Sequence, residues 1–108
     1  MDHIGWSGAR ACTLDFETTN TAYGDAGHPQ NRVVCASVGL GDERAWCKAW
    51  DDETREATRA ALASADLLVA HNAQFELAWI RREGLPWEHL LIWDTMLGER
   101  VLHTSKTV

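Results

Sequence analysis

The sequence lacks the features that mark several large classes of protein. Only two prolines occur among its 108 residues, and no period repeats, which excludes collagen-like and proline-rich chains. Its three cysteines include no CxxC pair, so a disulfide framework is not indicated. The longest purely aliphatic run, residues 67–70, is far too short to cross a membrane. These absences leave a small globular domain as the expected class.

Two further observations predict an intracellular, cytoplasmic protein. The first residues, Met1 to Gly5, are neither basic nor followed by an apolar segment, so no signal peptide is expected. Cys12, Cys35 and Cys47 all fall on predicted strands, where we expect buried, reduced thiols. The alternative for the cysteines is a zinc site that includes one of the five histidines.

Positive charge is also scarce, with 10 basic against 16 acidic residues and a net charge of −6. A protein that binds nucleic acid by itself usually carries a basic surface. If this chain binds nucleic acid, it either contacts only a few nucleotide units or relies on another chain for the basic surface. A cluster of active-site acids that metal ions neutralise would also lower the formal balance.

The spacing of apolar residues predicts five strands, at 9–17, 33–40, 44–50, 67–70 and 90–93. Two helices are expected, at 52–64 with Asp51 or Asp52 as N-cap and at 73–83 with Gly84 just beyond its end. A third helix is expected to start at Asp94 and to run to about Val101. This order predicts an α/β fold of the ribonuclease-H-like type: a mixed sheet of three antiparallel strands, then alternating β-α-β, flanked by helices.

The sharpest local feature is the acidic triplet Asp15-Phe16-Glu17 at the end of the first strand. Side chains at i and i+2 of a strand share a face, with Cα atoms roughly 6.5–7 Å apart. Two carboxylates held so close repel each other unless a cation joins them. Hard oxygen ligands favour Mg²⁺ or Mn²⁺ over zinc. The alternative interpretation is a solvated acidic strand end.

Two more polar features follow predicted strands. Asn72 and Glu76 are four residues apart, so they share one face at the start of a helix, at the strand end where open α/β sheets bind ligands. The alternative there is an asparagine cap followed by a surface glutamate. Asp94, followed by Thr95, predicts a helix start, and an N-cap is our preferred interpretation of it.

Three segments in this order, Leu14 to Thr19, His71 to Leu77 and Trp93 to Leu97, resemble motifs of the DnaQ-like (DEDD) 3′–5′ exonuclease superfamily. The similarity is strongest to the proofreading domain of family A DNA polymerases and covers roughly residues 9 to 102. It implies hydrolysis of nucleic-acid phosphodiesters with two divalent ions, Mg²⁺ or Mn²⁺. The implied substrate is the 3′ end of single-stranded DNA, with RNA possible. The resemblance assigns catalysis and metal binding to Asp15, Glu17 and Glu76, and the terminal nucleotide to Thr18, Asn72 and Phe75.

The sequence departs from the family pattern in two places. Glu76 stands where the second motif usually has aspartate, which keeps the charge and adds one methylene. The final motif, Tyr-x3-Asp or His-x4-Asp on a late helix, has no counterpart, because no acid follows Val101. His89 and Asp94 have the second spacing, but they fall on a predicted strand and are not assigned this role.

We therefore expect residues 1–108 to be a single, C-terminally truncated exonuclease domain within a split or multi-chain DNA polymerase assembly. A protein partner or a second copy would complete its site. The alternative is a catalytically inactive exonuclease-like module for binding or oligomerisation. An incomplete gene product is a third interpretation.

Overall fold

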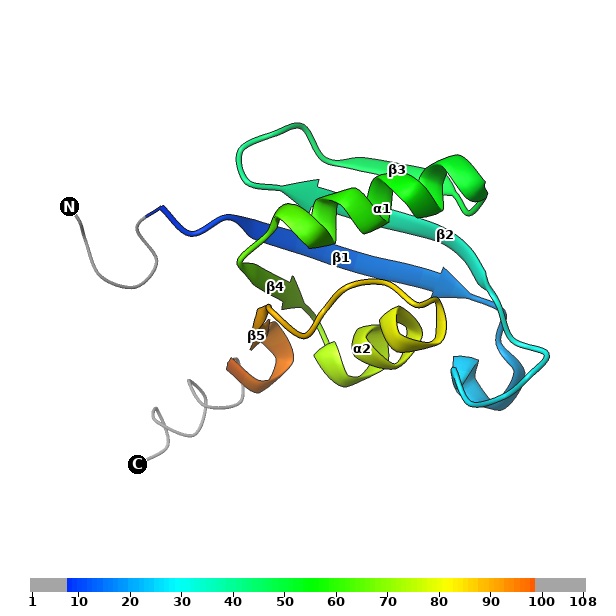
Figure 1. Ribbon diagram of the computed structural model, residues 1–108. Helices are drawn as coiled ribbons and strands as arrows, with labels where there is room; N and C mark the ends of the chain where they lie inside the picture. The colour runs from blue at the N-terminus through cyan, green and yellow to red at the C-terminus, as the bar shows by residue number, and fades with distance from the viewer. Residues whose placement is uncertain (1–7, 99–108) are drawn as a thin grey trace, which may run out of the picture.

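The computed structural model describes residues 8–98, which form a five-stranded sheet with its two α-helices on one side (Figure 1). The strand order is β3-β2-β1-β4-β5. β1 pairs antiparallel with β2, and β2 with β3, whereas β4 runs parallel to β1 and β5. The predicted ribonuclease-H-like α/β fold class is confirmed. The elements are β1 (Ala11–Thr18), η1 (Thr21–Gly24), β2 (Val33–Leu40), β3 (Trp46–Ala49), α1 (Asp52–Ser64), β4 (Leu67–Ala70), α2 (Ala73–Arg82) and β5 (Leu91–Asp94).

Local chemistry explains most of these bounds. The Asp51 carboxylate accepts a hydrogen bond from the Thr54 amide at 2.7 Å, which caps α1 as the sequence predicts. Gly84 has a φ of 70° just beyond α2, a left-handed conformation that glycine adopts freely. Residues 95–98 are helical, and the rest of the predicted third helix lies outside the described residues. No helix within residues 8–98 is long and apolar enough to cross a membrane.

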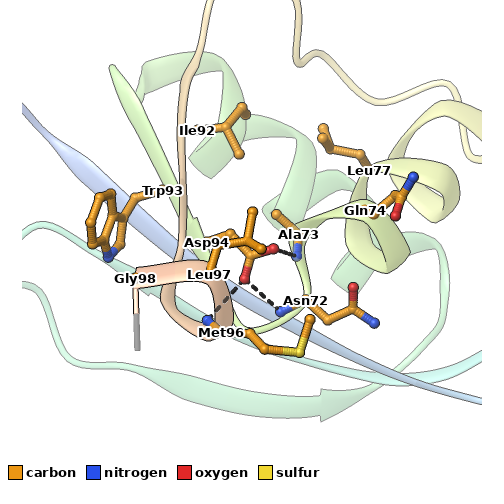
Figure 2. A pocket seen from close by; sticks show the side chains of 10 residues that line it. All are labelled: Asn72, Ala73, Gln74, Leu77, Ile92, Trp93, Asp94, Met96, Leu97 and Gly98. Atoms are coloured by element: carbon orange, nitrogen blue, oxygen red, sulfur yellow. Dashed lines mark hydrogen bonds between the residues drawn. The ribbon is translucent and has the colours of Figure 1, made fainter. Parts of the chain in front are cut away.

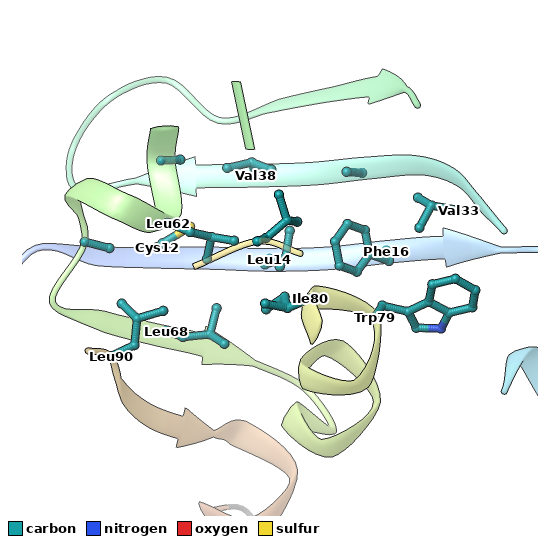
Figure 3. Packing of buried hydrophobic residues seen from close by; sticks show 14 residues of the cluster. Cys12, Leu14, Phe16, Val33, Val38, Leu62, Leu68, Trp79, Ile80 and Leu90 are labelled. Atoms are coloured by element: carbon teal, nitrogen blue, oxygen red, sulfur yellow. The ribbon is translucent and has the colours of Figure 1, made fainter. Parts of the chain in front are cut away.

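The hydrophobic core lies between one face of the sheet and the two α-helices (Figure 3). In β1 the burial alternates, so that Cys12, Leu14 and Phe16 are buried on this inner face. They belong to one cluster with Leu62 of α1 and Ile80 of α2, both fully buried. The period-two pattern of β1 therefore sends its apolar residues to the helices and its polar residues to the other side.

Neither α1 nor α2 covers the other side of the sheet, which we call the open face; the described contact there is at its edge, where a Cβ on Gly98 would lie 2.6 Å from the Trp93 ring. The register places Glu17 opposite Cys35, and Ser37 opposite Cys47, so the strands β1, β2 and β3 share this surface. Cys47 is exposed there and Cys35 is only half-buried, so the expectation of buried cysteines is confirmed for Cys12 alone. The reason is that, among the described elements, α1 and α2 both pack on the opposite face of the sheet. Members of the open face are Thr13, Asp15, Glu17, Cys35, Ser37, Cys47, Leu91 and Trp93.

Candidate carboxylate site

The site forms where β1 extends beyond its neighbour β4. Parallel pairing joins residues 11–13 of β1 to residues 67–69 of β4, and β4 ends at Ala70. β1 continues to Thr18, so its last residues have a neighbour strand on the β2 side only. The start of α2 lies beside this carboxyl end of β4, which is where open α/β sheets bind ligands.

Glu76 of α2 occupies the position that a β4 residue would otherwise take. Its Oε1 accepts a hydrogen bond from the Phe16 amide at 2.8 Å, and the side chain is only 2% exposed. Burial raises the pKa of the Glu76 carboxyl to about 7. The Phe16 hydrogen bond opposes this shift, while the negative charges of Asp15 and Glu17 add to it. The three predicted catalytic carboxylates are therefore electrostatic neighbours.

Asp15 and Glu17 project from the same face of β1 and are both exposed. Within residues 8–98, neither carboxylate has a hydrogen bond or an ion pair with a protein group. Their oxygen atoms are thus available to a ligand. Phe16, between them in the sequence, turns to the inner face: its ring is buried in the core and lies edge-on to Trp50, with 5.5 Å between the ring centroids.

The chemistry of this donor set suits hard divalent cations. Asp15, Glu17 and Glu76 supply carboxylate oxygens, and the Oε2 atom of Glu76 is buried with no protein donor among the described residues. Burial is the main cause of the raised pKa of Glu76, and a cation would relieve the repulsion from Asp15 and Glu17 that adds to it. In residues 8–98, however, no three histidine, cysteine or acidic side chains converge closely enough to hold an ion together. The carboxylates are neighbours that would have to move closer to share a cation.

Two of the three residues predicted to bind a terminal nucleotide lie together. A Cβ added to the buried Gly24 would lie 2.7 Å from Oγ1 of Thr18 and 3.5 Å from the ring of Phe75. Asn72 is exposed at the start of α2, with a φ of 66° and no capping hydrogen bond from its side chain. Asn72 therefore occupies the N-cap position, as the alternative interpretation expects, although its side chain makes no capping hydrogen bond; the surface glutamate of that interpretation is wrong, because Glu76 is buried.

Asp94 at the end of β5 has a different environment (Figure 2). Its Oδ1 accepts from the amides of Asn72 and Met96, and its Oδ2 from that of Ala73, each at 3.0 Å. Burial would raise the pKa of Asp94, but the amide donors outweigh it and lower the pKa below its ordinary value. Asp94 thus supports the next helical turn, as the N-cap interpretation expects, and also fixes the start of α2.

His89 and Asp94 do not form a pair. His89 Nε2 lies 3.1 Å from the Leu62 carbonyl oxygen, while the Asp94 carboxylate is surrounded by backbone amides. His71 Nδ1 lies 2.9 Å from Thr95 Oγ1, next to the Asp94 contacts. His89 and His71 therefore make local structural contacts, and of the two only His71 lies next to the Asp94 contacts.

A cavity of about 940 Å³ opens between α2 and β5, next to Asp94 (Figure 2). Its walls are mostly apolar, from Leu77, Ile92, Trp93 and Leu97. None of the three candidate catalytic carboxylates lines it. The cavity is a separate apolar groove along the β5 edge of the sheet.

Sequence reasoning missed the polar residues that hold the 19–32 loop beside the site. Asn31 is buried and has four hydrogen bonds to this loop, and Trp79 and Arg82 of α2 donate to loop carbonyls. A signal was present: Trp79 and Arg82 follow Glu76 at three-residue spacing, so all three share one face of α2.

The comparisons with known proteins bear on the fold. The sequence matches no protein-family model and no curated protein. Among solved structures, the fold is similar to the family B DNA polymerase from the hyperthermophilic archaeon Pyrobaculum calidifontis, with a TM-score of 0.57 and 15% sequence identity. The match covers 82% of this chain but only 15% of that polymerase. At this identity the likeness shows a shared α/β fold, and the chain corresponds to a small part of the larger protein.

Proposed function

We propose that this domain is a metal-dependent 3′–5′ exonuclease of the DnaQ-like superfamily that hydrolyses phosphodiesters at a nucleic-acid 3′ end, as in a proofreading polymerase. The observation that carries the proposal is that the buried Glu76 accepts a hydrogen bond from the Phe16 amide, between Asp15 and Glu17, at the carboxyl end of β4. A buried carboxylate beside two others costs stability unless a ligand compensates it. The similarity of the fold to a part of a DNA polymerase is consistent with this class.

In the proposed mechanism, Asp15, Glu17 and Glu76 would hold two divalent cations, Mg²⁺ or Mn²⁺. When bound, such ions supply a nucleophilic hydroxide and stabilise the charge of the transition state. The exposed Asp15 and Glu17 approach from the open face, while Glu76 approaches from α2. Thr18 and Phe75 contact the terminal nucleotide, and Asn72 lies at the start of the same helix.

We further propose that another chain segment covers the open face, either from a protein partner or from a second copy. This face carries two carboxylates on β1 and, on the other side of β4, the exposed apolar side chains of Leu91 and Trp93 on β5. The apolar groove between α2 and β5 adjoins it. Exposed apolar surface next to an edge strand is a common docking surface, and a covering segment would bring further groups to the metal ions.

The test is trimming of a 3′-labelled single strand by the purified chain with Mg²⁺ and with Mn²⁺, beside Asp15→Asn. The matched control is Asp42→Asn, the same change at an exposed turn. We expect metal-dependent shortening that falls roughly a thousandfold in Asp15→Asn, the loss of several kcal/mol of metal-based stabilisation. Equal, measurable trimming by all three proteins would contradict the proposal and indicate a contaminating nuclease, and no trimming by any of them would contradict it as well.

The second candidate is an inactive exonuclease-like module that binds a partner through the open face. The observation that favours it is that the described carboxylates do not converge on one metal position. In this case Asp15→Asn would leave partner binding unchanged, no strand would be shortened, and substitutions at Leu91 or Trp93 would weaken binding.

A further inference from the structure

The loop at 19–32, which joins β1 to β2, is held by buried polar contacts. Asn31 is 1% exposed, and its Oδ1 accepts from Thr19 Oγ1 at 2.9 Å and from the Thr21 amide at 3.1 Å. Its Nδ2 donates to the carbonyls of Thr21 at 2.6 Å and Asp25 at 3.0 Å. One buried side chain therefore joins both ends of the turn at 21–25.

Helix α2 holds the same loop from the other side. Trp79 Nε1 donates to the Gly24 carbonyl at 3.0 Å. Arg82 Nη1 donates to the carbonyls of Ala26 at 3.1 Å and His28 at 3.0 Å. Because Glu76 lies on this face of α2, the helix fixes the loop relative to the candidate carboxylate site.

In the middle of this fixed loop, Tyr23 is 97% exposed. Ala22 and Tyr23 have φ values of 50° and 61°, a left-handed conformation that is unfavourable for side chains larger than glycine. An aromatic ring in solvent adds nothing to the core. Unfavourable backbone conformations that the surrounding contacts maintain cluster at ligand-binding sites.

Tyr23 lies close in the sequence to the residues proposed to hold the terminal nucleotide. The next residue, Gly24, is buried against Thr18 and Phe75, since a Cβ there would lie 2.7 Å from Thr18 Oγ1 and 3.5 Å from the Phe75 ring. Tyr23 is thus one residue away from a contact with both side chains proposed to hold the terminal nucleotide. Its exposed ring therefore stands in solvent next to this contact.

We propose that Tyr23 is a stacking surface for a nucleobase of the single strand whose 3′ end lies at Asp15, Glu17 and Glu76. The inference rests on the proposed exonuclease function. A neutral aromatic ring stacks on any base, so this contact requires neither a particular nucleotide sequence nor a basic protein surface. This suits a chain of net charge −6, which gains little from phosphate contacts.

The experiment measures equilibrium binding of a fluorescent oligothymidylate in Mg²⁺ to chains that carry Asp15→Asn, so that the strand survives. Tyr23→Ala is expected to weaken binding by roughly 5- to 150-fold, the value of one base stack. The matched variants Tyr23→Phe and Tyr23→Trp keep a flat ring and should bind within about twofold of the Tyr23 protein. An abasic site moved along the strand should cost affinity at one position, and this cost should vanish in Tyr23→Ala.

Equal affinity of Tyr23→Ala and the Tyr23 protein would overturn the inference. So would an equal loss in the Phe and Trp variants, which would assign the effect to the hydroxyl group, and so would no measurable binding of the strand. Strand trimming with Asp15 present separates the two proposals. A position-specific base effect without trimming would keep the stacking site and reject the nuclease, whereas trimming without an effect of Tyr23 would do the reverse.

Discussion

The inner and open faces of the sheet are made by the same strands but carry different kinds of residue. In β1, Cys12, Leu14 and Phe16 join the core, while Asp15 and Glu17 face outwards between them. The period of two along the strand separates the residues that stabilise the fold from those that are free to bind a ligand. Adjacent residues of one strand thus serve stability and chemistry separately.

Glu76 belongs to neither face alone. It comes from the inner side, on α2, yet it is electrostatically coupled to Asp15 and Glu17 of the open face, and it binds the backbone of Phe16 between them. The gap beyond the end of β4 makes this possible. Asp94, in contrast, accepts hydrogen bonds from three backbone amides. The oxygens of Asp94 are bonded to backbone amides, so this carboxylate supports the local structure. Glu76 is repelled by two nearby carboxylates, and a bound cation would relieve this repulsion.

The largest effect should come from the difference in packing between the faces. Leu62→Ala removes a fully buried side chain and should lower the free energy of unfolding by about 2–5 kcal/mol. Leu91 is 63% exposed, and Leu91→Ala should lower the free energy of unfolding by no more than about 0.5 kcal/mol. Urea unfolding of the two variants measures both. Losses of similar size would indicate that a second layer packs on the open face in solution.

Glu76→Gln should stabilise the metal-free protein at high pH. The folded state binds more protons than the unfolded state between the ordinary pKa of 4.5 and the raised pKa of about 7. The free energy of unfolding of the unsubstituted protein therefore falls as pH rises through this window, by up to about 3 kcal/mol.

Gln is neutral and keeps an oxygen for the Phe16 amide, so the variant avoids this fall. Unfolding curves in EDTA at about pH 8 and about pH 4 measure the difference. We expect a gain at the higher pH only. If the variant and the unsubstituted protein differed in stability by the same amount at both pH values, the Glu76 carboxylate would be solvated. Glu76 would then not be coupled to Asp15 and Glu17 of the open face.

Thiol reactivity should distinguish the faces without changing stability. Burial raises the pKa of Cys12 from 9.0 to about 11, which leaves about a hundredfold less thiolate than an ordinary cysteine has. Cys47 is exposed on the open face. Alkylation of the folded chain, followed by mass spectrometry, should modify Cys47 first and Cys12 only after unfolding. Early modification of Cys12 would mean that the core opens locally.

The sequence predicts the elements well where one local signal dominates. The bounds of β2 and β4 agree with the apolar runs, and α1 starts at its Asp51 cap. The bound of β3 is less accurate, because β3 is an edge strand and its outward residues have no covering layer to give a pattern. Edge strands depend on their neighbours more than on their own residues.

The site was predictable as a list of residues but not as an arrangement. The spacing of Asp15 and Glu17 indicates their shared face, because strand geometry is local. The burial of Glu76 depends on β1 extending beyond β4, a relation between segments far apart in the sequence. The left-handed conformation at Ala22 and Tyr23 also escaped prediction, since neither residue favours it and the distant contacts of Trp79 and Asn31 impose it.

The hydrogen bond from the Phe16 amide to Glu76 also bears on the order in which the protein folds. β1 pairs with β2 across one loop, whereas its pairing with β4 joins Ala11 to Leu67 across more than half of the described chain. Contacts between distant segments form more slowly than local ones, because closing a long loop costs more entropy. We therefore expect β1 and β2, with Asp15 and Glu17, to pair before α2 packs against them. The Phe16 amide then gains its acceptor, Glu76, only when α2 packs against β1. The three carboxylates would come together in the same step that joins the distant segments of the fold.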